Sequence, residues 1–340
     1  MKKQIGIGLV GYGYWGPNLA RNFATNPATK LVSICDLSDE RRLGAEKALP
    51  GITATDSFEE LLNNEEIDAI AIATPTASHY PLAKASLLAG KHAFVEKPLT
   101  DSSATADELV ELAATSGLIL HVDHTFIYTA AVEFLAKSIS VGELGDLLYF
   151  DSSRVNLGLF QPDVNVLWDL AVHDLSILQY ITKRSPVAVS ATGVFHPQSS
   201  QASAAFMTVS YDDHFAAHID VSWMSPVKLR RTLISGTSKM LIYDDLEQIE
   251  KIKIFDAGID FPDSVDEIRK ILISYRTGDM VSPRLRETEA LAAEVTHFAE
   301  CVASGELSKT DGVLGATLVR ILEAATTSLN NGGAPVQIRN

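Results

Sequence analysis

Residues 5–16 read IGIGLVGYGYWG, and this stretch decides the fold of the first half of the chain. The apolar run over residues 4–10 predicts a buried strand, and a helical stretch follows to about residue 26. The glycines between them have the G-x-G-x-x-G spacing of a dinucleotide-binding turn. There the first glycine permits the turn, the second lets a pyrophosphate approach, and the third lets helix and strand pack closely. We expect cofactor contacts from Gly11, Tyr12, Gly13, Tyr14, Trp15 and Gly16.

An acid follows the second predicted strand at the spacing that such a turn requires. Residues 30–34 form that strand, and Asp36 lies about 20 residues after the last glycine. At this spacing a carboxylate accepts hydrogen bonds from both ribose hydroxyls of an adenosine. An acid there repels a 2′-phosphate and favours NAD. Arg41 and Arg42 lie just beyond and weaken that preference, so NADP stays possible. The alternative is a glycine turn without a ligand, which the following strand and acid make the poorer explanation.

Strands and helices then alternate along the chain. Apolar runs at residues 67–73, 91–96 and 118–122 predict strands, and helices are expected over 39–49, 57–63, 79–89 and 101–116. This alternation predicts a doubly wound parallel sheet, which binds ligands at the carboxyl ends of its strands. We assign residues 1–123 to this Rossmann-type dinucleotide-binding domain.

One strand of this sheet ends in a lysine. Residues 92–98 read HAFVEKP, so Lys97 emerges at the carboxyl end of an interior strand and Pro98 stops the strand. A lysine there can reach both a cofactor and a substrate, and the alternative is a solvated lysine at a strand end. The group Thr74, Pro75, Thr76 and His79 is expected at the same edge, although His79 could simply begin a helix.

The second half has a different pattern. Strands are expected over residues 146–155, 187–194, 204–211, 215–223, 229–235 and 239–243, with a last one at 336–338. Such a run predicts an α+β domain, residues 124–340, with a large open, mainly antiparallel sheet. Helices are expected over 130–140, 167–181, about 287–304 and 312–330, and the last of these can pack back on the first domain. A sheet covered on one face needs a partner for the other, so we expect a homodimer or homotetramer.

The helix over residues 167–181 carries the second chemical signal. Asp169 and His173 are four residues apart and lie on one helix face. A carboxylate one turn before a histidine orients it and raises its pKa, which suits a base near neutral pH. The alternative is a surface pair or a core histidine. A metal is not expected, because too few histidines and cysteines accompany Asp169, His173 and Asp174.

Composition excludes several classes of function. The 340 residues carry a formal net charge of -15, which argues against nucleic acid or an anionic membrane as partner. An anionic small molecule is not excluded. The two cysteines are too few for a disulfide framework, so a cytoplasmic protein with reduced thiols is expected. We find no signal-peptide pattern, and we expect no stretch of the chain to be long and apolar enough to span a bilayer.

Together the glycine turn, Asp36, the Glu96-Lys97-Pro98 motif and the D-x-A-x-H pattern at Asp169 and His173 resemble the Gfo/Idh/MocA oxidoreductase family over nearly the whole chain. The resemblance implies a Rossmann domain that holds NAD(P) and an α+β domain that holds a sugar or polyol. It also implies that Lys97, Asp169 and His173 are catalytic. In the family the peptide bond before the proline of this motif, here Pro98, is often cis. It places Thr74, Pro75, Thr76 and His79 beside the nicotinamide, with Glu96 and Thr125 among the cofactor-binding residues.

The chain departs from the family pattern in two places. Many members carry Asn-Arg-Arg after the sixth strand, where this chain has Thr-Phe-Ile-Tyr over residues 125–128. Many carry an aspartate three positions beyond the histidine, where this chain has Ser176. The stretches 122–128 (VDHTFIY) and 164–169 (VNVLWD) resemble a subgroup that includes nucleotide-sugar 3-dehydrogenases and 3-ketosugar reductases.

The resemblance implies hydride transfer between NAD(P) and a sugar hydroxyl or ketone, at C3 of a UDP- or TDP-linked sugar. His173 would act as base, Lys97 would bind the reacting oxygen, and Asp169 would hold His173 or a hydroxyl. Substrate contacts are expected from Tyr128, Arg154, Asn156, Asn165 and Trp168. Arg154 suits a phosphate or carboxylate, unless it is a solvated strand residue. Two alternatives remain, a dehydrogenase of a free polyol such as inositol and, ranked below it, a non-catalytic NAD-binding regulator.

Overall fold

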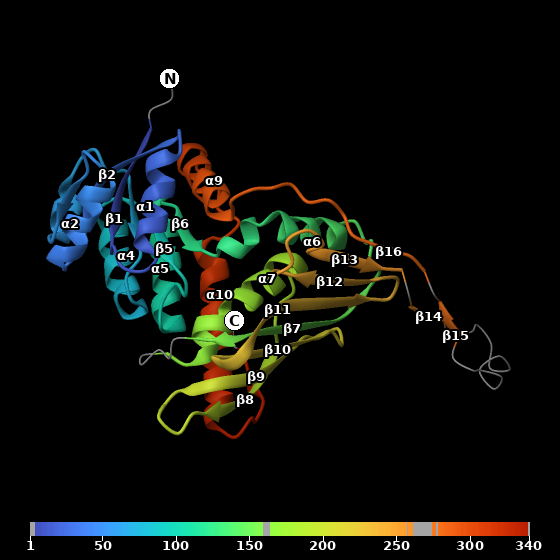
Figure 1. Ribbon diagram of the computed structural model, residues 1–340. Coiled ribbons are helices and arrows are strands. Elements are labelled where there is room, and N and C mark those ends of the chain that lie inside the picture. The colour runs from blue at the N-terminus through green and yellow to red at the C-terminus, as the bar shows by residue number, and fades with distance from the viewer. Residues whose placement is uncertain (1–3, 159–163, 257, 261–273, 277, 339–340) are drawn as a thin grey trace. The chain divides into compact units, whose positions relative to one another are not determined.

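The computed structural model describes residues 4–158, 164–256, 258–260, 274–276 and 278–338 (Figure 1). Contacts between Cα atoms divide the chain into two units, each built from two pieces of sequence. The first unit is Met1–Thr129 with Thr288–Glu323, and the second is Ala130–Glu287 with Ala324–Asn340. The sequence predicts a single boundary, between residues 123 and 124, and a return to the first domain only for the last helix.

Six parallel strands form the sheet of the first unit, in the order β3-β2-β1-β4-β5-β6. They are β1 (Ile5–Val10), β2 (Thr29–Cys35), β3 (Thr53–Thr55), β4 (Ala69–Ile72), β5 (His92–Glu96) and β6 (Leu120–Asp123). This order is that of a dinucleotide-binding sheet, so the predicted doubly wound sheet is confirmed. Only β3 was not predicted, because a strand of three residues gives no periodic signal.

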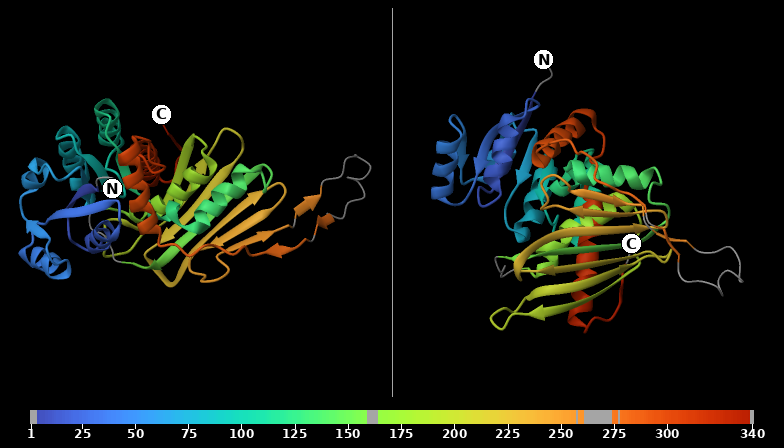
Figure 2. Two further views of the ribbon diagram at one scale, coloured as in Figure 1. Left: turned by 90° about the horizontal axis from the view of Figure 1, so that it is seen from above. Right: turned by 45° about the vertical axis from the view of Figure 1, so that its right-hand side comes forward.

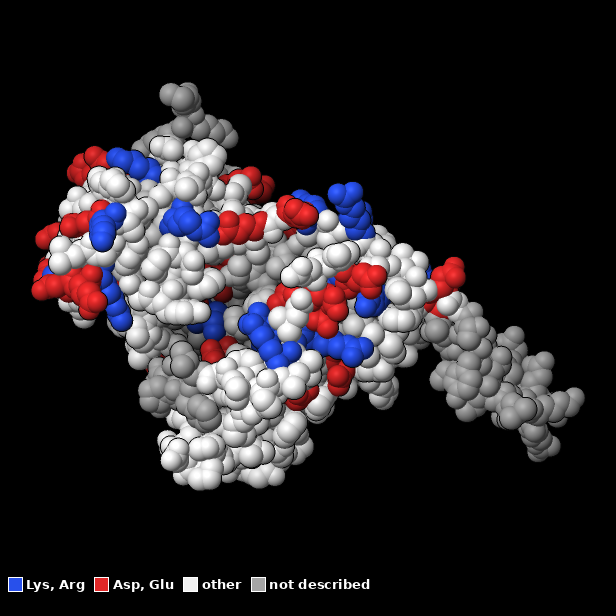
Figure 3. Space-filling model, in the orientation of Figure 1, with Lys and Arg blue, Asp and Glu red and all other residues white. Residues whose placement is uncertain are grey.

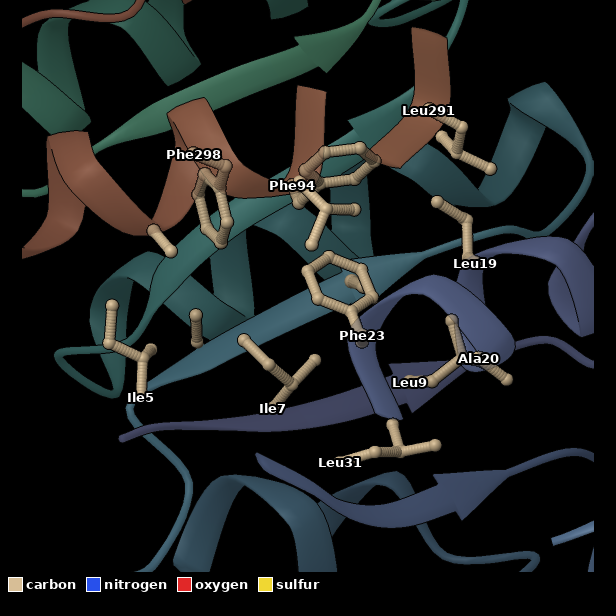
Figure 4. Packing of buried hydrophobic residues seen from close by; sticks show 14 of the residues in the cluster. Ile5, Ile7, Leu9, Leu19, Ala20, Phe23, Leu31, Phe94, Leu291 and Phe298 are labelled. Carbon is tan, nitrogen blue, oxygen red and sulfur yellow. The ribbon is translucent and has the colours of Figure 1, made fainter. Parts of the chain in front are cut away.

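Helices pack on both faces of this sheet. They are α1 (Gly16–Thr25), α2 (Asp39–Ala48), α3 (Phe58–Asn63), α4 (His79–Leu88), α5 (Ser103–Ser116) and α9 (Ala290–Ser304), with the 3-10 turns η1 (Thr76–Ser78) and η2 (Thr125–Tyr128). Figure 4 shows the core where α9 meets the sheet. Phe94 of β5 lies edge-to-face against Phe23 of α1 and against Phe298 of α9, with ring centres 5.4 Å apart in each pair. The apolar core of the first unit is therefore completed by α9, from late in the sequence.

The last helix, α10 (Gly312–Asn330), contributes to both units. It is long and apolar enough to cross a bilayer by length and composition, so the expectation that no stretch meets that test was wrong. However, 56% of its apolar window is buried inside the protein. Burial of this kind is typical of a core helix, which passes the same test of length and hydropathy.

Nine strands form the sheet of the second unit, in the order β16-β13-β12-β11-β7-β10-β9-β8-β17. They are β7 (Leu147–Leu157), β8 (Ala188–Phe195), β9 (Ala202–Ser210), β10 (Ala216–Ser222), β11 (Met224–Gly236), β12 (Met240–Asp244), β13 (Ile252–Phe255), β16 (Met280–Val281) and β17 (Val336–Gln337). Only the central pair β7–β10 is parallel, which confirms the mainly antiparallel sheet. A two-stranded ribbon, β14 (Gly258–Asp260) with β15 (Ser274–Arg276), stands apart from it.

Within the part of the chain that the structure describes, the helices of this unit lie on one face of the sheet (Figure 2). They are α6 (Ala130–Ser140), the π-helical turn η3 (Leu167–Ala171), α7 (Val172–Thr182) and the last turns of α10. The uncovered face exposes large apolar side chains, among them Tyr149 of β7, Phe206 of β9 and Leu229 of β11. The open face therefore exists as expected, and an oligomer formed through it stays a prediction.

Charged side chains of both signs lie side by side on the surface. On the face shown in Figure 3, Lys and Arg are interspersed with Asp and Glu. Elsewhere in the described chain, charged side chains form ion pairs, such as Lys84 with Glu108 and Arg184 with Asp213. On the face shown in Figure 3, positive side chains are therefore mixed with negative ones.

Candidate active site

The glycine turn between β1 and α1 is shaped by close backbone contacts. Gly11 has φ +92°, and a Cβ atom there would lie 2.5 Å from the Ala73 carbonyl oxygen. A Cβ on Gly16 would lie 2.3 Å from the Gly11 carbonyl oxygen. A Cβ on Gly13 would meet only the Arg41 guanidinium, at 3.6 Å. The fold itself therefore requires Gly11 and Gly16, whereas Gly13 keeps open the space above the turn that a pyrophosphate needs.

A cavity of about 610 Å³ lies beside this turn, lined by Tyr12, Asp36, Leu37, Ser38, Glu40, Arg41 and Gly44. The Asp36 carboxylate accepts from the backbone N–H groups of Tyr12 at 2.7 Å and Ser38 at 2.8 Å. Each of its oxygens keeps a lone pair for a ribose hydroxyl. Arg42 donates to the Asp36 carbonyl and pairs with Asp39, while the exposed Arg41 lies 3.7 Å from the Asp36 carboxylate. These residues fit an adenosine with free 2′- and 3′-hydroxyls.

The carboxyl ends of β4, β5 and β6 lie together at this edge of the sheet. Ile72 pairs with Val95, and Glu96 pairs with Asp123. Lys97 and His124 are therefore neighbours at the ends of adjacent strands, about 5 Å apart in the backbone. The Glu96 carboxylate accepts from the Lys97 N–H at 2.8 Å, and the Lys97–Pro98 peptide bond is cis.

His79 ties two loops of this edge together. Its Nε2 lies 2.8 Å from the Thr74 carbonyl oxygen and its Nδ1 lies 2.8 Å from the Pro98 carbonyl oxygen. Burial lowers the pKa of His79, although the two carbonyls oppose that shift. The Ser78 hydroxyl donates to the Thr74 hydroxyl at 2.7 Å. His79 thus fixes the loop after β4, with Pro75 and Thr76, to the segment that carries Lys97.

The segment after β6 is mostly buried. The carboxylate of Asp123 accepts from the Trp15 indole at 3.0 Å and from the Thr125 hydroxyl. Tyr128 is 1% exposed, its hydroxyl lies 3.1 Å from that of Thr310, and Lys309 lies over its ring. The structure gives Tyr128 a packing role, and a contact with substrate would require this hydroxyl to leave Thr310.

His124 lies next to Lys97 and is also buried. Neither of its ring nitrogens reaches a hydrogen-bond partner among the residues that the structure describes. Burial, helped by the charge of Lys97, lowers the pKa of His124 to about 3, so the ring is neutral. This histidine was not predicted as a site residue.

The second unit holds the other predicted catalytic residues. Asp169 lies in η3 and His173 in the first turn of α7, and both are partly exposed. The Asp169 carboxylate accepts from the Trp223 indole at 2.9 Å. A π-helical turn is rare and is often found at functional sites. Trp223, which fixes Asp169, was not predicted because nothing in the strand pattern marks it.

Two predicted substrate residues hold this turn in place. The Asn165 side-chain oxygen accepts from the Leu167 N–H at 3.0 Å, at the start of η3. The Trp168 indole donates to the Thr326 hydroxyl of α10 at 2.9 Å. Asn165 and Trp168 are 6% and 9% exposed, so each contributes to the wall of the unit around Asp169.

Arg154 of β7 is neither of the two things expected from the sequence. It is 3% exposed, and its Nε and Nη2 atoms donate to Asp174 at 2.7 and 3.0 Å. The Ser152 hydroxyl donates to the same carboxylate at 2.9 Å. Arg154 therefore belongs to a buried ion pair under α7, because Asp174, which directly follows His173, lies on the buried side of that helix. Asn156, two residues further along β7, is partly exposed.

The predicted site residues thus fall into two groups. The first unit gathers the glycine turn, Asp36, the loop after β4 and Lys97, and the second gathers Asp169, His173, Asn165 and Trp168. That Lys97 and His173 face one substrate stays a prediction. Among the described residues, no cluster of His, Cys, Asp and Glu side chains is arranged to hold a metal ion.

Comparison with known families agrees with this geometry. Residues 5–124 match the oxidoreductase family with an NAD-binding Rossmann fold, and residues 132–242 match the GFO/IDH/MocA C-terminal domain. The chain belongs to the Gfo/Idh/MocA family of oxidoreductases, and its first unit is an NAD-binding Rossmann domain.

Individual relatives are sugar and polyol oxidoreductases. The UDP-N-acetylglucosamine 3-dehydrogenase of Acidithiobacillus ferrooxidans is 28% identical over 326 residues, which cover 94% of each chain. The scyllo-inositol 2-dehydrogenase (NAD(+)) of Bacillus subtilis is 27% identical and covers 99% of this chain and 97% of its own. The crystal structure of GenD2 from gentamicin A biosynthesis, in complex with NAD, has the same fold, with a TM-score of 0.83 at 20% identity over 100% of this chain and 98% of its own.

Proposed function

We propose that the protein transfers a hydride between NAD and C3 of a sugar linked to a nucleoside diphosphate, UDP or TDP. The similarity to a UDP-N-acetylglucosamine 3-dehydrogenase over 94% of both chains carries this choice of substrate. The position of Lys97 at the end of β5, on the same edge of the sheet as the NAD turn, supports the class of reaction. Both cysteines are buried and form no disulfide, which is consistent with the cytoplasmic location that we expect.

The chemistry divides between the two units. When bound, the nicotinamide supplies the hydride acceptor or donor. In the oxidative direction His173 takes the hydroxyl proton while the carbon loses its hydride, so a ketone remains. The Lys97 ammonium donates a hydrogen bond to the same oxygen and offsets the negative charge that develops on it. Asp169, held by Trp223, keeps His173 or a neighbouring hydroxyl in position.

A free polyol is the second candidate substrate. It is favoured by the scyllo-inositol 2-dehydrogenase, which aligns with 99% of this chain. An inositol presents the same secondary alcohol to Lys97 and His173 without a nucleotide to bind. The two candidates therefore share the catalytic residues and differ in the rest of the substrate site.

A substrate panel with isotopic labels separates these candidates. NAD reduction is followed with UDP-N-acetylglucosamine, TDP-glucose, myo-inositol and scyllo-inositol. We expect turnover of a nucleotide sugar, and we expect deuterium at C3, but not at C4, to appear in the NADH. Turnover of inositols alone would favour the polyol. Transfer from another carbon would refute the C3 assignment, and no turnover of any of them in either direction would refute the proposal.

The catalytic residues are tested separately. Lys97→Ala and His173→Ala should each lower turnover by about 10²–10⁴-fold, because each removes charge stabilisation or proton transfer at the reacting oxygen. NADH affinity should stay within a fewfold of the wild type, and Lys47→Ala, on the exposed side of α2, is the matched control. Hydride transfer at the wild-type rate in either variant, measured by stopped flow, would contradict the assigned role.

A further inference from the structure

Three acidic side chains meet behind the NAD turn, at the ends of β5 and β6. Glu96 and Asp123 are register partners, and Glu294 reaches them from α9. Asp123 and Glu294 are 2% and 0% exposed. Carboxyl groups so close together cannot all be ionised away from water, so at least one of them holds a proton.

The hydrogen-bond partners differ between Asp123 and Glu294. The Asp123 carboxylate is surrounded by donors, namely the Trp15 indole and the Thr125 hydroxyl. Glu294 has a different environment, because its Oε1 lies 3.1 Å from His121 Nε2 while no donor among the described residues reaches its Oε2. Burial and the neighbouring Asp123 raise the pKa of Glu294 well above its usual value, and burial lowers that of His121 well below its own.

These states give one consistent arrangement of protons. Neutral His121 donates from Nε2 to Glu294 Oε1, and its Nδ1 accepts from the Ser308 hydroxyl at 2.9 Å. A proton held by Glu294 would then face Asp123, its acidic neighbour in this cluster. The pKa of Glu96 is also raised, chiefly by burial and then by Asp123, while Lys97 and its N–H oppose the shift.

We propose that Asp123 and Glu294 are positioning residues of the dinucleotide site: Glu294 donates a hydrogen bond to Asp123, and Asp123 holds the Trp15 indole. Trp15 is the N-cap residue of α1, and its carbonyl accepts from the Asn18 N–H at 2.9 Å. Holding Trp15 therefore fixes the first turn of α1, whose free N–H groups face the pyrophosphate position. Helix α9 is connected to cofactor binding through this chain of three side chains.

The test compares two replacements of Glu294 that match its size. Glu294→Gln keeps a donor toward Asp123 and an acceptor toward His121, whereas Glu294→Met keeps neither. We expect NADH affinity within about twofold of the wild type for the glutamine variant and about tenfold weaker for the methionine variant. Glu300→Met, exposed on the same helix, is the control.

A double-mutant cycle with Trp15→Phe tests whether Glu294 acts through Trp15. In the Trp15→Phe protein the indole donor is absent. Adding Glu294→Met to that protein should therefore weaken its NADH binding by less than about twofold. In ¹⁵N spectra, which show three tryptophan indoles, the Trp15 N–H resonance should shift in the Glu294→Met variant but not in the Glu294→Gln or Glu300→Met variants.

Three results would overturn the proposal. The first is a glutamine variant that binds NADH as weakly as the methionine variant, and the second is multiplicative losses in the cycle with Trp15→Phe. The third is a Trp15 resonance that shifts in the glutamine variant, which keeps this test open even if the methionine variant does not fold. NADH binding requires no sugar, so a failure to find a sugar substrate would leave the outcome of these measurements unchanged.

Discussion

Two glycines of the NAD turn lead to opposite expectations, so replacing each with alanine separates binding from folding. A methyl group on Gly13 would lie 3.6 Å from the Arg41 guanidinium, an ordinary contact with a flexible side chain. A methyl group on Gly16 would lie 2.3 Å from the Gly11 carbonyl oxygen, against the 3.4 Å at which ordinary contacts begin. Neither glycine has a positive φ, so only the surrounding space decides the outcome.

The magnitudes follow from these distances. Gly13→Ala should change the free energy of unfolding by less than about 1 kcal/mol, in the stabilising direction, because alanine restricts the unfolded chain. It should weaken NADH binding at least about tenfold, since the methyl group occupies the space that a pyrophosphate approaches. Gly16→Ala should cost about 2–3 kcal/mol of stability, because helix and strand must move apart by roughly 1 Å.

Urea unfolding and fluorescence titration with NADH measure the two effects on the same samples. We expect the Gly13→Ala protein to be stable and to bind NADH poorly, and we expect the Gly16→Ala protein to be unstable. A Gly13→Ala protein with wild-type NADH affinity would show that the pyrophosphate does not lie over Gly13. A Gly16→Ala protein with wild-type stability would show that the close contact with Gly11 is easily relieved.

Three further predictions concern single charged or titratable groups. Asp36→Ala should shift the ratio of Michaelis constants toward NADP by about tenfold, because the carboxylate no longer repels a 2′-phosphate; unchanged constants for both cofactors would contradict this. Arg154→Met should cost about 3–5 kcal/mol in urea unfolding by leaving Asp174 buried without its cation, and the double variant with Asp174→Leu should recover most of that loss. The pKa of His124 is about 3 in the folded protein, below its unfolded value near 6.5, so stability falls as the pH drops below 6.5. His124→Gln should therefore lose about 2 kcal/mol less than the wild type between pH 7 and pH 5, and equal losses in both proteins would refute the buried neutral ring.

The Rossmann half could be predicted from sequence because its signals are local. The glycine turn, Asp36 and the apolar strands can each be recognised from a pattern of about ten residues. Their order along the chain predicts the strand order of the sheet. Strand β13, of four residues, and the two-residue edge strand β16 were not predicted, since β13 follows a polar segment and both are short. Short edge strands carry little periodic signal.

The supporting residues of the site could not be predicted in the same way. Trp223 fixes Asp169 from 54 residues away, and Glu294 contacts His121 from 173 residues away, so no spacing rule connects them. The identity of Arg154 gave no indication of its buried partner Asp174, which only the packing of α7 on β7 brings within reach. Sequence patterns identified the reactive groups, whereas the groups that hold them depend on tertiary contacts.

The return of the chain to the first unit has a consequence for synthesis on the ribosome. Phe298 of α9 completes the aromatic core around Phe23 and Phe94, yet it is translated about two hundred residues after Phe94. At about 5–20 residues per second, the nascent NAD-binding sheet waits roughly ten to forty seconds with an apolar face uncovered. During that interval the uncovered apolar face is a surface that chaperones can bind. A fragment that ends at Thr129 would expose the same face permanently.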